Sequence, residues 1–151
     1  QFEGPESGMG LCKPFFKSLL KNKVTEETNK YWDNLPKLRQ SKLFLKQHNK
    51  HRQSFCRNLS KQNLHVVTRL LTGHNTMNGH LHKIGLHNDG LCRYCNLDFE
   101  TSEHILMDCP ALASKRHSYL GKPTYNQEQV ATIEIPRLLR FIKAIGLEDV
   151  I

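Results

Sequence analysis

Four metal-donor side chains are concentrated in one short segment of the chain. Cys92, Cys95, His104 and Cys109 form the series Cys-x2-Cys-x8-His-x4-Cys within eighteen residues. Three thiolates and one imidazole fill the tetrahedral coordination sphere of Zn²⁺, which is the arrangement of structural zinc. The alternative is three buried free cysteines and a surface histidine, but two close pairs separated by one loop favour a metal. The series therefore predicts a zinc site that holds the local fold together.

The residues around these donors indicate how the site is built. The spacing of Cys92 and Cys95 suits one tight turn that directs both sulfurs at the same ion. Thr101 is a good N-cap for a short helix through His104, and Pro110 limits how far that helix continues. We therefore expect a turn followed by a helix, with ligands supplied by both.

Disulfide bonds are the competing explanation for the cysteines. The chain has five cysteines, an odd number, and Cys12 and Cys56 lie far from the cluster. The residues after Gln1 lack the basic start and apolar run of a secretory signal. We expect a reducing intracellular location, nuclear and cytoplasmic, with Cys12 and Cys56 as core or surface thiols rather than ligands of a second metal.

The positive charge of the chain is unevenly distributed. The formal net charge is +8, and the segment between Asp33 and Asp89 contains no acidic residue. The cations of this acid-free segment are Lys37, Arg39, Lys42, Lys46, Lys50, Arg52, Arg57, Lys61, Arg69 and Lys83. Its histidines are His48, His51, His65, His74, His80, His82 and His87. Such a field attracts nucleic-acid phosphates through counterion release, the alternative being a solvated basic face kept for solubility. We expect RNA or DNA as a partner.

Seven residues are the candidates for nucleic-acid contact. Arg93, inside the cysteine turn, is expected to point outward and reach a phosphate. Its neighbour Tyr94 is expected either to stack on an unpaired base or to cover the metal. The other candidates are Arg52, Arg57, Lys61, Arg69 and Lys83.

Three histidines near the cysteine turn form a second cluster. His74, His80 and His82 are more often hydrogen-bonded to backbone carbonyls at helix ends than ligands of another ion. We favour the first interpretation, and leave the second open.

The hydrophobic pattern predicts a mainly α-helical fold, with an extended arm at the amino terminus. Helices are expected from Pro14, from Thr25 through Tyr31 and Trp32, from Ser60 to Gly73, from Asn75 to Gly85, from Thr101, from Pro110 to Gly121, and from Pro136 to Gly146. The rings of Tyr31 and Trp32 are expected in a core, and the stretch from Asn34 to Asn58 is expected to be a loop with a helical turn. No apolar run approaches the length of a membrane span, so no membrane association is expected.

Four segments are expected along the chain. Residues 1–12 are an arm from a missing upstream domain, 13–58 a helical basic segment, 59–121 a helical zinc-binding module and 122–151 a helical carboxyl-terminal segment. Only 38% of the residues are hydrophobic, so the core is thin, and zinc binding would contribute folding free energy. Phe141 and Ile142, on the last helix, are expected to lack enough core to cover them, which motivates a docking role.

Several short motifs, taken in order, resemble a known family. They are Leu71-Thr72-Gly73-His74, His80-Leu81, Gly85-Leu86, Cys92-Arg93-Tyr94-Cys95, Glu100-Thr101-Ser102-Glu103-His104-Ile105-Leu106 and Cys109-Pro110-Ala111-Leu112. This series resembles the zinc-binding region after the ribonuclease H domain at the carboxyl end of jockey-like non-LTR retrotransposon reverse transcriptases. The resemblance implies a parent RNA-directed DNA polymerase that copies its own RNA at a nicked target, with the upstream polymerase and ribonuclease H domains as partners. The zinc region would help to hold nucleic acid.

Catalysis is not expected from this chain itself. A polymerase or ribonuclease H needs clustered carboxylates for magnesium, and the basic half of the chain has none. Glu103 stands beside His104 like the general base of a zinc hydrolase, but three thiolates leave no coordination position for water. The sequence thus predicts a nucleic-acid-binding zinc module. The alternative is a protein-interaction or scaffold module that docks on the polymerase or another protein.

Overall fold

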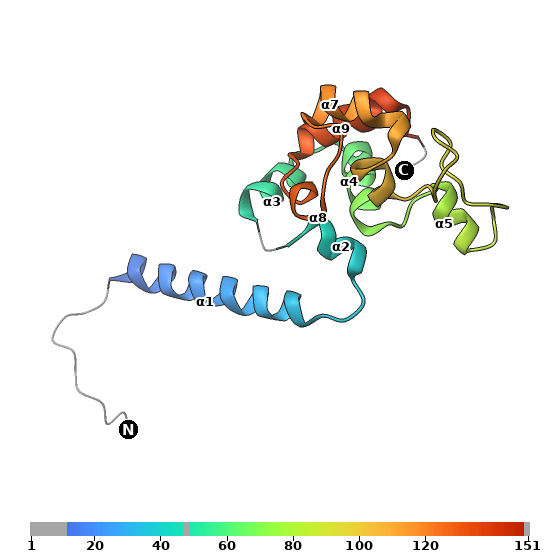
Figure 1. The fold of residues 1–151 in the computed structure, drawn as a ribbon. Coiled ribbons are helices and arrows are strands. Elements are labelled where there is room, and N and C mark those ends of the chain that lie inside the picture. Colours follow the sequence, from blue (N-terminus) through green and yellow to red (C-terminus); the bar gives the residue numbers. More distant parts are fainter. Residues whose placement is uncertain (1–11, 47–48, 150–151) are drawn as a thin grey trace. The chain divides into compact units, whose positions relative to one another are not determined.

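The fold is mainly helical, as the hydrophobic pattern predicted (Figure 1). The computed structural model describes residues 12–46 and 49–149. The amino-terminal arm expected in residues 1–12 therefore lies, up to residue 11, outside the described residues, as does His48. The described part contains helices and one isolated antiparallel bridge between Leu91 and Phe99.

The chain divides into two compact units, one ending at Pro36 and the other beginning at Lys37. The first unit contains α1 (Lys13–Asn34), a single continuous helix. The helix boundary expected at Thr25 is wrong, because the Thr25 hydroxyl donates to the Lys21 carbonyl at 2.8 Å and the helix continues through it. Tyr31, expected in a core, is 68% exposed, and no residue of α1 is buried.

The second unit holds all the remaining elements. They are α2 (Arg39–Phe44), α3 (Lys50–Arg57), α4 (Lys61–Thr72), α5 (Asn78–Lys83), α6 (Ser102–Met107), the 3-10 turn η1 (Pro110–Leu112), α7 (Ala113–Leu120), α8 (Gln127–Val130) and α9 (Ile135–Ile145). Helices α2 and α3 replace most of the loop expected between Asn34 and Asn58. Phe44, which is 3% exposed, explains the difference, because it anchors α2 in the core.

Local signals set the ends of several helices where the sequence predicted them. The Ser60 hydroxyl accepts the Asn63 backbone N–H at the start of α4, and Gly73 ends this helix with a φ of +76°. The Thr101 hydroxyl caps α6 in the same way. Asn75 does not cap α5 as expected. The Asn75 side chain instead accepts a hydrogen bond from the backbone N–H of Met77. Helix α5 begins at Asn78, two residues after Thr76, which would be the first helical residue if Asn75 were the cap.

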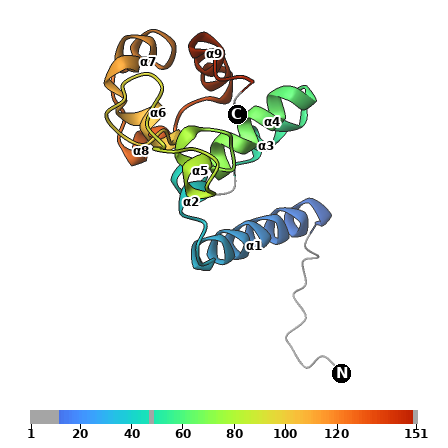
Figure 2. The same ribbon diagram turned by 90° about the vertical axis from the view of Figure 1, so that its right-hand side faces the viewer.

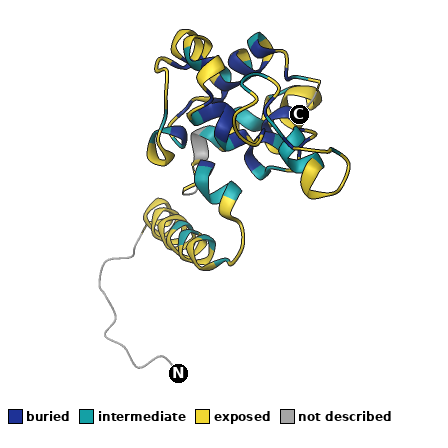
Figure 3. Cartoon of the chain, turned by 45° about the vertical axis from the view of Figure 1, so that its right-hand side comes forward, coloured by how far each residue is buried: buried dark blue, intermediate teal, exposed yellow. Residues whose placement is uncertain are grey.

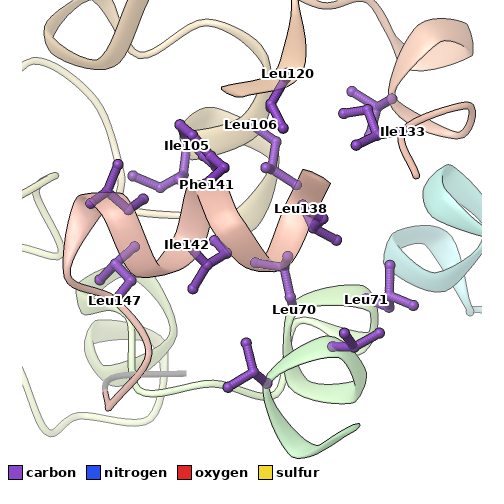
Figure 4. Packing of buried hydrophobic residues seen from close by; sticks show 14 of the residues in the cluster. Leu70, Leu71, Ile105, Leu106, Leu120, Ile133, Leu138, Phe141, Ile142 and Leu147 are labelled. Atoms are coloured by element: carbon purple, nitrogen blue, oxygen red, sulfur yellow. The ribbon is translucent and has the colours of Figure 1, made fainter. Parts of the chain in front are cut away.

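One core unites the second unit. Its buried hydrophobic residues come from α2, α4, α6, α7, α9 and the cysteine turn, and α7 packs along α9 (Figures 2 and 3). Phe141 and Ile142 are 0% and 1% exposed, so the expectation that the core leaves them uncovered is wrong. Leu70 extends from α4 toward α9 in the same cluster (Figure 4).

This core is shared by more than one of the expected segments. Residues 59–121 and the described part of 122–151 belong to the same compact unit, which also includes α2 and α3. Within the helices expected from Ser60 and from Asn75, the apolar side chains of Leu64 and Ile84 are 39% and 52% exposed. None of the helices in the described ranges combines the length and hydropathy that crossing a bilayer demands.

Candidate metal centre

The four predicted ligands meet in the second unit. One donor atom from each of Cys92, Cys95, His104 and Cys109 lies within 4.8 Å of all the others. The sulfurs of Cys92 and Cys109 are 3.8 Å apart, and the Cys95 sulfur is 3.3 Å from His104 Nε2. Ideal tetrahedral coordination at zinc bond lengths requires about 3.8 Å between two sulfurs and about 3.6 Å between sulfur and nitrogen. The arrangement therefore fits one tetrahedral ion.

A tight hairpin positions the first two ligands. The Cys92 backbone N–H donates to the Asp98 carbonyl and the Asn96 N–H donates to the Cys92 carbonyl, both at 2.8 Å. Asn96 turns the chain with a φ of +53°, a conformation that asparagine tolerates better than most residues. The two-residue cysteine spacing thus produces the expected turn, which carries both sulfurs on one side.

Burial and neighbouring groups shift the pKa values of the three thiols. Burial raises the pKa of Cys92, and burial together with the Cys92 thiolate raises the pKa of Cys109 to about 12. At Cys95 burial also raises the pKa, but the Leu97 backbone N–H and the His104 ring outweigh it and bring the pKa to about 7. Three thiolates repel one another in so small a space, whereas a coordinated cation deprotonates thiols and neutralises their charge.

A carboxylate orients the imidazole ligand. His104 Nδ1 lies 2.9 Å from Asp108 Oδ1, four residues along the chain, and 4.0 Å from Asp98 Oδ2. When Nδ1–H donates to this carboxylate, Nε2 keeps its lone pair toward the sulfurs, which is the usual support for a histidine bound to a metal. Asp108 was not among the residues predicted from the sequence. The available signal was a carboxylate at the i+4 position after the histidine.

Arg93 does not point outward as expected. Its Nε donates to Glu100 Oε1, and its Nη2 donates to Glu100 Oε2 at 3.0 Å. The Glu100 side chain is 0% exposed and also accepts the Asn78 backbone N–H at 2.8 Å. A buried carboxylate needs such partners, because an unpaired buried charge is costly. Arg93 therefore ties the cysteine turn to the segment entering α6 and to the start of α5.

Tyr94 is engaged with the protein rather than available as a stacking platform. Its ring is partly buried against the core, and its hydroxyl donates to the Ile145 carbonyl at the end of α9 at 2.8 Å. Burial raises the pKa of Tyr94 to about 12. Of the two roles expected for this residue, covering the metal turn agrees with its position, and stacking on a base does not.

Arg52 was expected to contact phosphate but has a structural role. Its Nη1 donates to the Phe44 carbonyl at 2.7 Å, and its Nη2 donates to the carbonyls of Ala131 and Ile133 at 3.0 Å each. Burial lowers the pKa of this guanidinium. Arg52 thus joins α2 and α3 to the segment between α8 and α9.

The remaining predicted cations occupy the surface. Arg57, Lys61 and Lys83 are exposed, and Arg69 is partly buried. Their contact with nucleic acid stays a prediction. Glu103, next to the histidine ligand, accepts a 2.6 Å hydrogen bond from Arg39 Nη2.

The histidine cluster does not assemble as a second metal site. His82 Nδ1 lies 3.0 Å from the His87 carbonyl, which is the backbone interaction that was favoured. His74 and His80 meet edge to face, with ring centroids 5.9 Å apart. Among the described residues, the three-cysteine, one-histidine set is the group of metal donors close enough to share an ion, and neither Cys12 nor Cys56 belongs to it.

A buried arginine that the sequence analysis did not single out as a site residue supports the last ligand. Arg116 is 0% exposed, and its Nη2 donates to the Cys109 carbonyl at 2.6 Å. Its other donors bond to the carbonyls of Pro123 and Ile105 at 2.7 and 3.2 Å. Charge-assisted bonds of this kind are about twice as strong as neutral ones. They fix the end of α6 and therefore the position of the Cys109 sulfur.

Comparison with known proteins adds no further constraint. No family model, no curated protein and no solved structure matches the chain. The assignment of a metal site therefore depends on the donor residues alone. Four convergent donors could bind a metal ion, and they would fill a tetrahedral sphere without leaving a position for water or substrate.

Proposed function

We propose that the metal is Zn²⁺ and that its role is structural. Thiolate and imidazole are the donors that zinc prefers, and the separations of 3.8 Å between the Cys92 and Cys109 sulfurs and 3.3 Å between the Cys95 sulfur and His104 Nε2 are close to those of a tetrahedron at zinc bond lengths. Two of the sulfurs, those of Cys92 and Cys109, belong to completely buried residues of the core. Binding free energy at such a site is folding free energy, so zinc stabilises the whole second unit.

Metal analysis of the purified chain tests this assignment. We expect stoichiometric zinc in the native chain and loss of zinc in Cys95→Ser, with Cys56→Ser as the matched control because Cys56 lies outside the cluster. Chelation should also lower the thermal stability of the native chain and of the control. A native chain that folds cooperatively with only trace metal would disprove the zinc proposal.

We propose further that the second unit binds RNA or DNA through the phosphate backbone. The observation that carries this proposal is the cationic outer surface of α3 and α4. Arg57 and Lys61 are exposed there, and Arg69 is partly exposed, in a segment that contains no acidic residue over its whole length. Clustered cations of this kind release counterions when they meet a polyanion. This is why affinity should depend steeply on salt.

Fluorescence anisotropy with labelled single strands and duplexes tests binding directly. We expect the logarithm of the association constant to fall linearly with the logarithm of the salt concentration. The zinc-loaded chain should bind, and the chelated chain should bind weakly or not at all. No detectable binding at low ionic strength would refute the nucleic-acid role while leaving the zinc site intact.

The resemblance of the segment from Leu70 to Leu112 supports a more specific origin. We propose that the chain is the carboxyl-terminal part of a retrotransposon reverse transcriptase, and that it acts on template or target with the upstream polymerase and ribonuclease H domains. The chain itself is proposed to be non-catalytic. Incubation with labelled RNA–DNA hybrid and Mg²⁺ tests this, and hydrolysis by the native chain that is lost in Cys95→Ser and absent from a buffer blank would contradict it.

Docking on another protein remains the second candidate. The structure buries Phe141 and Ile142, which first motivated it, but α1 carries apolar side chains that are about half exposed, including Phe16 and Leu20 at 49% and 60%. Light scattering of the native chain and of a Phe16→Asp, Leu20→Asp variant tests for self-association through this helix. Identical monomeric masses would count against self-docking by α1.

A further inference from the structure

A groove lies between α4 and α9 on the second unit. It has a volume of about 260 Å³, and its walls include Gln62 and Asn63 from α4 and Arg140 and Lys143 from α9. Val66 and Ile142 also line it, and both are buried. The volume is below the range of about 300–1,000 Å³ that encloses a small-molecule ligand. An open channel with amide and cationic walls instead suits an extended chain that passes through it.

The cations on α9 result from the amphipathic pattern of this helix. Leu138, Phe141 and Ile142 turn to the core and are at most 4% exposed. At 100° per residue, Arg140 and Lys143 then fall on the opposite, solvent-facing side, and both are exposed. Arg140 and Lys143 were not predicted from the sequence, because they lie outside the acid-free segment.

The cations on α4 lead into the same groove. On a helix of 3.6 residues per turn, Arg69 lies within about 20° of the direction of Gln62, and His65 lies about 60° from it. Lys61 lies about 100° from Gln62 in the same rotational direction. Arg69, His65 and Lys61 therefore form a stripe from the groove edge to the outer face of α4. Glu148 is the acidic residue among those lining the groove, against the two cations of α9.

We propose that this groove holds the sugar–phosphate backbone of a single-stranded nucleic acid. Arg140 and Lys143 pair with phosphates on one wall, and the α4 stripe extends the cationic track. The amides of Gln62 and Asn63 lie where they can bond to sugar hydroxyls and base edges. This inference rests on the proposed nucleic-acid function and extends its binding surface from the cations of α3 and α4 to the groove between α4 and α9.

The metal turn and the groove are physically connected. The Tyr94 hydroxyl, between the first two ligands, bonds to the Ile145 carbonyl, and Lys115 Nζ bonds to the neighbouring Ala144 carbonyl at 2.8 Å. Both contacts hold the carboxyl end of α9, one and two residues beyond Lys143. The cysteine turn therefore holds one wall of the groove, so a structural metal would support binding without touching the ligand.

A charge-reversal experiment on the full zinc-loaded chain tests the groove. The test variant is Arg140→Glu with Lys143→Glu. The control is Lys122→Glu with Arg137→Glu, which changes the net charge equally but lies around the separate hollow beside Tyr125. The probe is a labelled single strand of about twelve nucleotides, made as DNA and as RNA. Binding is measured by anisotropy over a salt series, and circular dichroism checks that both variants remain folded.

The groove predicts a specific change in the salt dependence. Each phosphate contact on a single strand contributes about 0.7 to the slope of log K against log salt, so loss of two contacts should reduce the slope by about 1.4. At low salt the affinity of the test variant should fall roughly tenfold more than that of the control. Equal losses of slope in the two variants would overturn the groove assignment but not the proposed function. A native chain that binds neither strand would overturn both.

Discussion

The ion pair between Arg93 and Glu100 gives the sharpest test of the structure. The perturbation is Arg93→Met, which keeps most of the aliphatic length but removes the guanidinium. Glu100 then keeps the Asn78 backbone N–H as a partner but loses both charge-assisted bonds while its side chain stays 0% exposed. If Arg93 only reached outward for phosphate, the same substitution would leave the stability of the protein unchanged.

The expected magnitude follows from the burial of the two partners. Breaking a fully buried ion pair by removing one member costs about 3–5 kcal/mol. Here the Arg93 side chain is 33% exposed, so solvent screens part of the interaction, and we expect a loss of about 2–3 kcal/mol in the free energy of unfolding. Glu100→Gln in the Arg93→Met background should recover part of this loss, because the uncompensated charge is gone.

Urea denaturation of the zinc-saturated chain, followed by far-ultraviolet circular dichroism, measures these differences. The matched control is Arg39→Met, which breaks the ion pair of Arg39, 85% exposed, with Glu103 and should cost less than about 1 kcal/mol. The four chains of the Arg93 and Glu100 double-mutant cycle give the coupling energy. A coupling energy below about 0.5 kcal/mol, or equal costs for Arg93→Met and Arg39→Met, would refute the reasoning.

Three other predictions concern the contacts of single side chains. Asp108→Asn should weaken zinc binding about 10–100-fold in chelator competition without unfolding the chain, because it weakens the support of His104. Tyr94→Phe should reduce the loss of unfolding free energy that accompanies a rise in pH in the alkaline range. The pKa of Tyr94 is about 12 in the folded state and about 10 in the unfolded state, so its contribution to stability is complete below pH about 10 and disappears as the pH rises through about 12. Arg52→Met should cost about 3 kcal/mol in urea denaturation and leave the salt dependence of nucleic-acid binding unchanged.

The ligand set was predictable from the sequence because its information is local. All four donors lie within eighteen residues, and the spacing of Cys92 and Cys95 specifies a turn that few other structures require. The helix ends at Ser60, Gly73 and Thr101 were predictable for the same reason, since a cap depends on the three or four residues beside it. Where the structure departs from the sequence prediction, the determining contact is usually distant.

The roles of the arginines show this limit most clearly. Arg52 bonds to carbonyls that are 79 and 81 residues further along the chain, and nothing near it in sequence indicates those partners. A charge count treats every arginine as solvent-exposed, whereas the fold buries Arg116 and engages Arg52 and Arg93 with internal acceptors. Counting charges along the sequence did not identify Arg140, because this residue lies outside the acid-free segment. The groove that Arg140 lines forms only when α4 and α9 pack together.

The metal site and the hydrophobic core form one cooperative structure rather than two. Cys92 and Cys109 are themselves fully buried members of the core that contains Phe141 and Leu147 of the carboxyl-terminal segment. Loss of the ion would leave buried thiols facing one another at the centre of that core, and loss of α9 would uncover the apolar residues that pack around them. A 59–121 module with all four ligands but without α9 therefore lacks core residues and the Ile145 carbonyl that the cysteine turn contacts. The segment with the four metal donors and the helix α9 share this core, and this is the physical basis on which we propose that the metal is coupled to binding in the groove.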